Sequence, residues 1–143
     1  MFIITEEMKQ MLIDEAVKML ARSYIPYSHF AVGAALLTKD DRIYTGCNIE
    51  NAGLTPGNCA ERTAFFKAVS EGERDFKAIA IVGGMNREVS DYCAPCGVCR
   101  QVMREFCEPD EFVVILAKNR DEYKEFTLED LLPMGFGPEN LKQ

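Results

Sequence analysis

Two stretches of the sequence carry residue types that could do chemistry, Cys59-Ala60-Glu61 and Pro95-Cys96-Gly97-Val98-Cys99. Residues three apart share one face of a helix, so Cys96 and Cys99 can hold one ion together, and Cys59 can supply a third thiolate from another helix. A thiolate-rich tetrahedral site selects zinc, and three protein ligands leave a fourth position open, as in catalytic sites. The sequence therefore predicts an open zinc site with Cys59, Cys96 and Cys99 as ligands.

Glu61 follows the first of these ligands by two residues, so it lies close to the metal without having to bind it. Zinc lowers the pKa of a bound water to about 7 in favourable sites, and a carboxylate at this place suits a general acid and base. Three thiolates on one Zn²⁺ leave a net negative charge, which Arg62 can offset by donating a hydrogen bond to a ligand sulfur. A simpler interpretation stays open, because Asn58 and Glu61 also have the spacing of a capping box.

The elements that must position these residues follow from hydrophobic periodicity and capping signals. Asn58 is a good N-cap, which puts Cys59 at N1 and Glu61 at N3 of a helix over 58–70, and Pro95 suits N1 of a helix that ends at about Phe106. The other predicted elements are helices over 5–22 and from near Thr127 to before Pro133, and strands over 30–38, 42–47, 77–83 and 112–117.

These elements predict an α/β fold, a three-layer α/β/α sandwich with a mixed central sheet. The strand runs are apolar throughout, as expected for a sheet that is covered on both faces. Residues 1–143 contain no repeat, linker or low-complexity tract, so we expect a single domain.

Charge and composition exclude several classes of partner. The net charge is −7 and Lys and Arg do not cluster, which argues against a nucleic-acid polymer as ligand. No apolar run approaches the roughly 18 residues of a membrane span, and the N-terminus lacks the pattern of a signal peptide. We therefore expect a cytoplasmic protein with reduced thiols, in which clustered cysteines indicate metal rather than disulfides.

The remaining cysteines and the only histidine are expected to stand outside the chemistry. Cys93-x-x-Cys96-x-x-Cys99 resembles part of an iron–sulfur pattern, but the usual fourth cysteine three residues further on is absent. Cys47, Cys93 and Cys107 are interpreted as spare thiols, and His29 is not needed as a ligand.

The sequence closely resembles the small homotetrameric cytidine deaminases, from about Leu12 to Leu141. The two cysteine stretches are also the zinc deaminase signature in its three-cysteine form. The resemblance lies in Pro26-Tyr27-Ser28-His29-Phe30 with Val32-Gly33-Ala34-Ala35, Gly46-Cys47-Asn48-Ile49-Glu50-Asn51-Ala52, Asn58-Cys59-Ala60-Glu61-Arg62-Thr63-Ala64 with residues 67–72, Pro95-Cys96-Gly97-Val98-Cys99-Arg100-Gln101-Val102, and Leu131-Leu132-Pro133 with Phe136.

The resemblance implies hydrolysis of cytidine and 2′-deoxycytidine to the uridines and ammonia, as in pyrimidine salvage. It implies one zinc ion per subunit and attack of zinc-bound hydroxide on C4 of cytosine, with Glu61 as the proton shuttle. A zinc deaminase of another aminated nucleoside, such as a blasticidin-like antibiotic, and a non-catalytic metal-binding module remain alternatives.

The resemblance also implies residues that bind the nucleoside. Phe30 matches an aromatic residue that packs against the pyrimidine, although a core residue opening a strand would look the same. Asn48 and Glu50 match residues that bond the ribose hydroxyls, although ordinary turn chemistry would also account for them. The Ala60 backbone is expected to meet the base edge, and Phe136 to reach the site of a neighbouring subunit in a homotetramer with shared active sites. Leu54 departs from the family, which usually has Tyr there, and this puts in doubt a polar contact near the site and the subunit interface.

Overall fold

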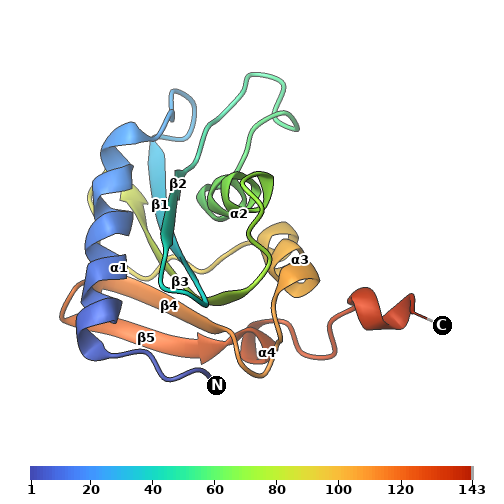
Figure 1. Cartoon of the computed structure of the whole chain (residues 1–143). Coiled ribbons are helices and arrows are strands. Elements are labelled where there is room, and N and C mark those ends of the chain that lie inside the picture. The colour runs from blue at the N-terminus through green and yellow to red at the C-terminus, as the bar shows by residue number, and fades with distance from the viewer. Residues whose placement is uncertain (143) are drawn as a thin grey trace.

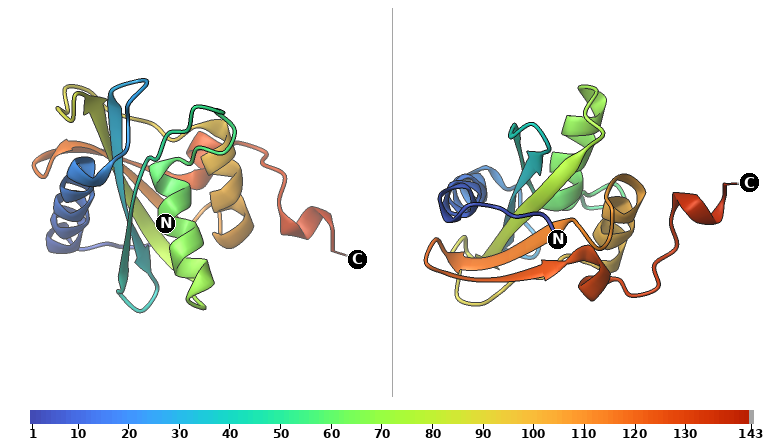
Figure 2. Two further views of the ribbon diagram at one scale, coloured as in Figure 1. Left: turned by 90° about the horizontal axis from the view of Figure 1, so that it is seen from above. Right: turned by 60° about the horizontal axis from the view of Figure 1, so that its bottom comes forward.

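The computed structural model describes residues 1–142, which form three layers (Figure 1). A five-stranded sheet lies between α1 on one face and α2 and α3 on the other (Figure 2). The predicted α/β/α sandwich is confirmed. The elements are α1 (Glu6–Met19), η1 (Leu20–Arg22), β1 (Phe30–Thr38), β2 (Ile43–Cys47), α2 (Ala60–Ser70), β3 (Phe76–Met85), α3 (Gly97–Phe106), β4 (Val113–Asn119), β5 (Glu122–Thr127), α4 (Leu128–Leu131) and η2 (Pro138–Asn140).

The sheet is mixed, with the strand order β2-β1-β3-β4-β5. Only β3 and β4 pair in parallel, and the other three neighbouring pairs are antiparallel. The crossover between the parallel strands contains α3, which packs on the same face as α2. This connection brings the start of α3 beside the start of α2.

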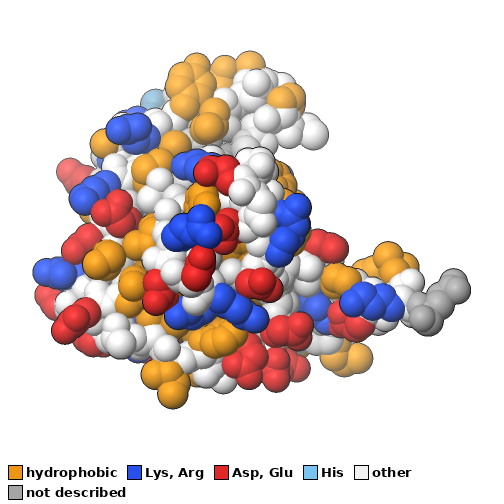
Figure 3. All heavy atoms as spheres, in the orientation of Figure 1, with side chains coloured by type: hydrophobic (Ala, Val, Ile, Leu, Met, Phe, Trp, Pro, Cys, Tyr) orange, Lys and Arg blue, Asp and Glu red, His pale blue; other side chains and the backbone are white. Residues whose placement is uncertain are grey.

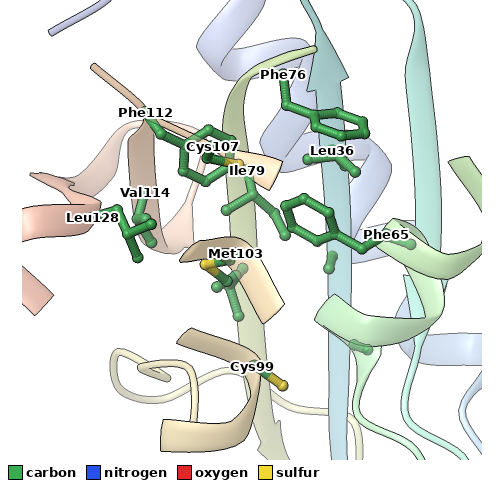
Figure 4. Close-up of a cluster of buried hydrophobic side chains, with 14 of the residues drawn as sticks. Leu36, Phe65, Phe76, Ile79, Cys99, Met103, Cys107, Phe112, Val114 and Leu128 are labelled. Carbon is green, nitrogen blue, oxygen red and sulfur yellow. The ribbon is translucent and has the colours of Figure 1, made fainter. Parts of the chain in front are cut away.

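The sheet buries a hydrophobic cluster on each face. Alternate residues of β3 divide between the clusters, with Ile79 and Ile81 facing α2 and α3 and Ala80 and Val82 facing α1. This two-sided burial explains the uninterrupted apolar run of the strand. Figure 4 shows the cluster under α2 and α3, where the aromatic rings lie among aliphatic side chains from the central strands.

Cys99 belongs to this cluster. It is buried, as is Met103 one turn further along α3 (Figure 4). Phe65 of α2 packs edge-on against Phe76 of β3, with ring centroids 5.1 Å apart. The packing that holds α2 and α3 on the sheet therefore also fixes one of the predicted metal ligands.

The structure corrects two expectations about helix starts. Cys59, not Asn58, is the N-cap of α2, and its side chain makes no capping bond. Asn58 instead donates from Nδ2 to Thr63 Oγ1 at 3.1 Å, so the capping-box interpretation of Glu61 is wrong. Similarly, Cys96 rather than a residue before Pro95 is the N-cap of α3. The first helical residue lies one position later than predicted in α2 and two positions later in α3, because the backbones of Cys59 and Cys96 are extended.

The strand β5 was not predicted. Its six residues pair only with β4 at the edge of the sheet, and their side chains are exposed or half-buried. A charged edge strand lacks the apolar signal of a buried strand, so hydrophobicity alone does not predict a strand over residues 122–127.

The first helix is shorter than predicted. It ends at Met19, and residues 20–22 form a 3₁₀ turn instead of continuing the helix.

None of the helices within residues 1–142 has the length and hydrophobicity needed to cross a bilayer.

Gly46 sets the distance between β2 and the start of α2. A Cβ atom at this position would lie 2.3 Å from the carbonyl oxygen of Ala60 and 2.6 Å from the backbone nitrogen of Ala64. We therefore expect Gly46→Ala to displace the first turn of α2, to lower the free energy of unfolding by about 1–3 kcal/mol and to reduce the bound zinc. Urea denaturation and metal analysis of the purified protein measure both effects.

Gly97 at the start of α3 provides the matched control, because a Cβ there would meet nothing within 4 Å. Gly97→Ala should leave stability unchanged or slightly raised, since alanine is the better helix former. Equal stability and zinc content of the two variants would show that close contact at Gly46 does not position α2.

Candidate metal centre and substrate pocket

Three cysteine side chains meet at the N-termini of α2 and α3. Cys59 and Cys96 are the two N-cap residues, and Cys99 lies in the first turn of α3. The first turns of helices carry N–H groups without intrahelical partners and a partial positive charge, both of which stabilise thiolates. The predicted ligands are thus brought together by two helix starts, though at different cap positions than the sequence indicated.

The three sulfur atoms have the spacing that zinc requires. Cys96 Sγ lies 3.9 Å from Cys59 Sγ and 3.6 Å from Cys99 Sγ, and all three lie within 4.8 Å of one another. Zn–S bonds of about 2.3 Å in a tetrahedron separate two sulfurs by about 3.8 Å. The cluster is therefore suited to one zinc ion.

The cluster is polarised towards a thiolate at Cys59. Hydrogen bonding from the Cys99 thiol, and then from Arg62, lowers the pKa of Cys59, whereas the same contact and burial raise the pKa of Cys99. Arg62 Nη2 donates to Cys59 Sγ at 3.2 Å, and Arg62 Nε is buried without a hydrogen-bond partner within residues 1–142. A cation therefore lies against one of the sulfurs, where it can offset the charge of a thiolate-rich site.

Glu61 is buried beside this cluster. The residue is 4% exposed, and burial raises the pKa of its carboxyl to about 7. A carboxyl group with a pKa near neutrality can both accept and release a proton. Glu61 therefore combines position and acidity in the way that a proton-transferring group needs.

A cavity of about 380 Å³ opens onto the cluster. Its lining includes Cys59, Ala60 and Glu61 from the start of α2, and Asn48 and Glu50 from the segment after β2. The volume falls in the usual range for small-molecule sites. Arg62 and Cys96 line it as well, so seven of the predicted site residues share one cavity.

Short backbone ladders join the two sides of this cavity. Ile49 pairs with Asn58, each donating its N–H to the other's carbonyl at 2.9 Å. On its other side the same segment pairs with Tyr24, which donates to the Asn48 carbonyl at 3.0 Å and accepts from the Glu50 N–H at 2.9 Å. The segment that carries Asn48 and Glu50 is thereby fixed to the residue preceding Cys59.

The side chains of Asn48 and Glu50 are held by backbone groups. Asn48 Oδ1 accepts from the Val32 N–H at 2.9 Å, and its Nδ2 donates to the Phe30 carbonyl at 2.8 Å. Glu50 Oε1 accepts from the N–H groups of Tyr27 and Ser28 at 3.0 and 3.1 Å, and hydrogen bonds led by the Ser28 side chain lower the pKa of the carboxyl. These two polar groups are therefore presented to the cavity in fixed orientations.

Two predicted aromatic contacts lie outside the cavity lining. Phe30 and Cys93 both lie close to Gly83, since a Cβ atom there would be 3.1 Å from Phe30 Cε1 and 2.8 Å from Cys93 Sγ. Cys93 lines the cavity, whereas Phe30 is not among the lining residues. Phe136 is 57% exposed and lies on the C-terminal segment that extends away from the rest of the chain (Figure 1). Neither ring therefore touches the cavity of its own chain directly, and His29 is exposed and outside the lining.

The cavity also includes residues that the sequence did not single out as site residues. Val32 lies two residues beyond Phe30 on β1, and Cys93 lies three residues before Cys96. Strand periodicity could have suggested Val32, whereas Cys93 lies in the irregular segment before α3, where periodicity gives no signal. Cys93 is outside the three-sulfur cluster of the described residues, and burial raises the pKa of its thiol to about 11.

Comparisons with known proteins agree with this geometry. Residues 6–116 match the family model described as the cytidine and deoxycytidylate deaminase zinc-binding region. A cytidine deaminase of Sporosarcina psychrophila is 51% identical over 130 residues, covering 91% of this chain and 92% of the relative. One of Halalkalibacterium halodurans is 50% identical over 133 residues, covering 93% and 97%. The crystal structure of cytidine deaminase from Burkholderia pseudomallei superposes with a TM-score of 0.81 at 43% identity, covering 93% of this chain and all of that one.

Proposed function

The chain belongs to the cytidine and deoxycytidylate deaminase family, and we propose that it hydrolyses cytidine and 2′-deoxycytidine with Glu61 as the group that moves the protons. The observation that carries the proposal is the buried Glu61 carboxyl, which shares a nucleoside-sized cavity with three thiols spaced for one zinc ion. Cytidine and water give uridine and ammonia, so the reaction needs a nucleophilic oxygen at C4 and protons for the ring and the leaving amine.

The residues of this chain divide these tasks. Cys59, Cys96 and Cys99 would hold the zinc, which when bound supplies the Lewis acidity that makes water a nucleophile near neutral pH. Glu61 takes the proton released by the attacking water, passes it to N3 of the base and then delivers a proton to the departing amine. One carboxyl can serve both transfers because it is buried beside the cluster on the wall of the same cavity, within reach of both reacting atoms.

The other predicted site residues bind the substrate in this proposal. Asn48 and Glu50 bond the ribose hydroxyls, supported by their shared position on the cavity wall and by the backbone bonds that orient them. The Ala60 backbone meets the base edge from the first turn of α2. Phe30 packs against the pyrimidine, which requires its ring to reach the cavity past Cys93.

We propose that the protein is a homotetramer in which Phe136 enters the site of a neighbouring subunit. The support is the exposure of Phe136 and of Met134 on the extended C-terminal segment, and of Tyr27, Ile49 and Leu54 around the cavity. In Figure 3 hydrophobic side chains gather at the top of the molecule, over the loops before β1 and after β2, and extended apolar patches mark interaction surfaces.

We further propose that this single-domain enzyme acts in the cytoplasm, in pyrimidine salvage. The six cysteines are unpaired in the structure, as they are in a reducing compartment, and three of them are needed as thiolates. Free nucleosides are the substrates that salvage supplies.

Glu61→Gln should retain zinc and lose roughly a hundred- to ten-thousandfold in kcat, since the amide keeps the shape of the side chain but cannot exchange protons. The loss of ultraviolet absorbance of cytidine, 2′-deoxycytidine and a blasticidin-like nucleoside measures activity, with zinc quantified in the same samples. Glu71→Gln, at the exposed far end of α2, is the matched control and should leave kcat unchanged.

A Glu61→Gln protein with full zinc and full activity would show that another group moves the protons. A wild-type protein that contains zinc but deaminates only the blasticidin-like compound would favour the alternative substrate.

Leu54 departs from the family at the mouth of the cavity, and its backbone is strained. It is 82% exposed and has a φ of 64°, in the left-handed region that is unfavourable for leucine. Leu54→Tyr is expected to lower KM for cytidine about two- to tenfold, as one added polar contact would. Leu54→Phe supplies the ring without the hydroxyl and should leave KM near the wild-type value. If Leu54→Tyr changes neither KM nor the sedimentation mass, the missing hydroxyl has no part in binding or assembly.

A further inference from the structure

The turn that follows β3 carries an arginine whose side chain reaches across to the segment after α1. Arg87 Nε donates to the Leu20 carbonyl at 3.0 Å, and Arg87 Nη2 donates to the Ser23 carbonyl at 2.9 Å. We propose that Arg87 is a positioning residue for the side of the pocket formed by Asn48 and Glu50. This proposal rests on the function proposed above, because it assigns that side of the pocket to the sugar of the nucleoside.

Arg87 binds at the C-terminal end of the helical segment, where its guanidinium is a further donor to the Leu20 carbonyl and a donor to the Ser23 carbonyl. Leu20 begins the 3₁₀ turn η1 and Ser23 is its C-cap, with the Ser23 hydroxyl also donating to the Leu20 carbonyl at 2.7 Å. A cation is favoured at the C-terminus of a helix, and a guanidinium can donate to two carbonyls at once. Arg87 therefore fixes the direction in which the chain leaves α1.

The backbone around Arg87 holds the side chain in place. Asn86 and Arg87 have φ values of 54° and 66°, and such strained conformations persist where the surroundings enforce them. The Asn86 N–H donates to the His29 carbonyl at 2.7 Å. A Cβ at Gly84 would lie 1.8 Å from the Glu88 carbonyl oxygen, so only glycine lets the turn fold back so closely.

The segment held by Arg87 forms hydrogen bonds with both the backbone and the side chain of Glu50. Tyr24, next to Ser23, accepts from the Glu50 N–H, and the N–H groups of Tyr27 and Ser28 donate to the Glu50 carboxylate. Glu50 therefore depends on residues 24–28 for its backbone position and for its side-chain orientation. Loss of the Arg87 contacts frees the start of this segment.

The side of the pocket that carries the three cysteines and Glu61 is held in place by contacts that do not involve Arg87. Ile49 pairs with Asn58, and the starts of α2 and α3 pack on the sheet through the core that contains Cys99. Loosening residues 20–28 should thus lower the fraction of molecules in which Asn48 and Glu50 are already in the orientation that binds the sugar. The groups that act on the base should stay in place. Apparent affinity falls by the fraction of competent molecules, whereas turnover of the bound complex is preserved.

The test compares Arg87→Ala with wild type in the full zinc-loaded protein. KM for cytidine should rise about three- to tenfold, with kcat within about twofold and zinc content unchanged. Arg87→Lys, which keeps one cationic donor, should recover part of the affinity. The matched control is Arg120→Ala, which should leave KM unchanged. Arg120 lines one surface hollow together with Arg87, but its only ion pair among residues 1–142 is with Asp14, at 3.3 Å.

Hydrogen exchange provides a readout that does not depend on activity. In Arg87→Ala the amides of Tyr24 and Glu50 should exchange about three- to tenfold faster, while those of Thr63 and Arg100 in α2 and α3 keep their wild-type rates. This local pattern together with the KM effect supports the proposal. If Arg87→Ala does not fold, Arg87→Gln is judged by the same criteria.

A lower melting temperature with unchanged KM and unchanged exchange at Tyr24 and Glu50 would overturn the proposal, because Arg87 would then serve stability alone. A fall in kcat with loss of zinc would overturn it as well. If the wild-type protein deaminates no cytidine, the proposed function fails, and the exchange pattern alone then decides whether Arg87 positions this segment.

Discussion

The convergence of two helix N-termini on one face of the sheet is the constraint on which the rest of the structure depends. Thiols at the N-caps of α2 and α3 come within the reach of one ion only because both helices pack on the same face of the sheet through a shared core. Gly46 permits the close approach of α2, and Cys99 belongs to that core itself. Burial of Glu61 follows from the same packing, and burial is what raises its pKa towards neutrality. Fold stability and site chemistry therefore have a common origin.

The pocket has a second side that is built from backbone ladders and loops. Ile49 links this side to Asn58 and so to Cys59, a proposed metal ligand, while the Tyr24 segment holds Glu50. Two ladders of a few hydrogen bonds thus set the distance between the groups proposed to bind the sugar and those proposed to act on the base. An enzyme that must place one atom of a nucleoside beside a metal benefits from such a rigid spacing.

The sequence predicts the parts of this structure that have a strong local signal. The apolar runs of β1 and β3 identify the central strands, and the spacing of Cys96 and Cys99 identifies a shared helix face. Prediction from the sequence fails where tertiary contacts override the local preference of the residues. Asn58 has the propensity of an N-cap, but pairing with Ile49 keeps it outside the helix, and β5 is a charged edge strand recognisable only by its partner β4. The meeting of Cys59, Cys96 and Cys99 was predictable from their spacing, whereas the contacts of Arg87 join residues distant in sequence and left no local signal.

The central claim is an open zinc site made by three thiols from two helices. X-ray absorption at the zinc K-edge of the purified protein measures the ligands directly. The structure predicts three sulfur neighbours at about 2.3 Å and one lighter atom at about 2.0 Å, from Cys59, Cys96, Cys99 and a displaceable water. A shell of four sulfurs would show that a further cysteine closes the site and makes it structural. A shell of nitrogen and oxygen alone would contradict the account, because the metal would then lie elsewhere.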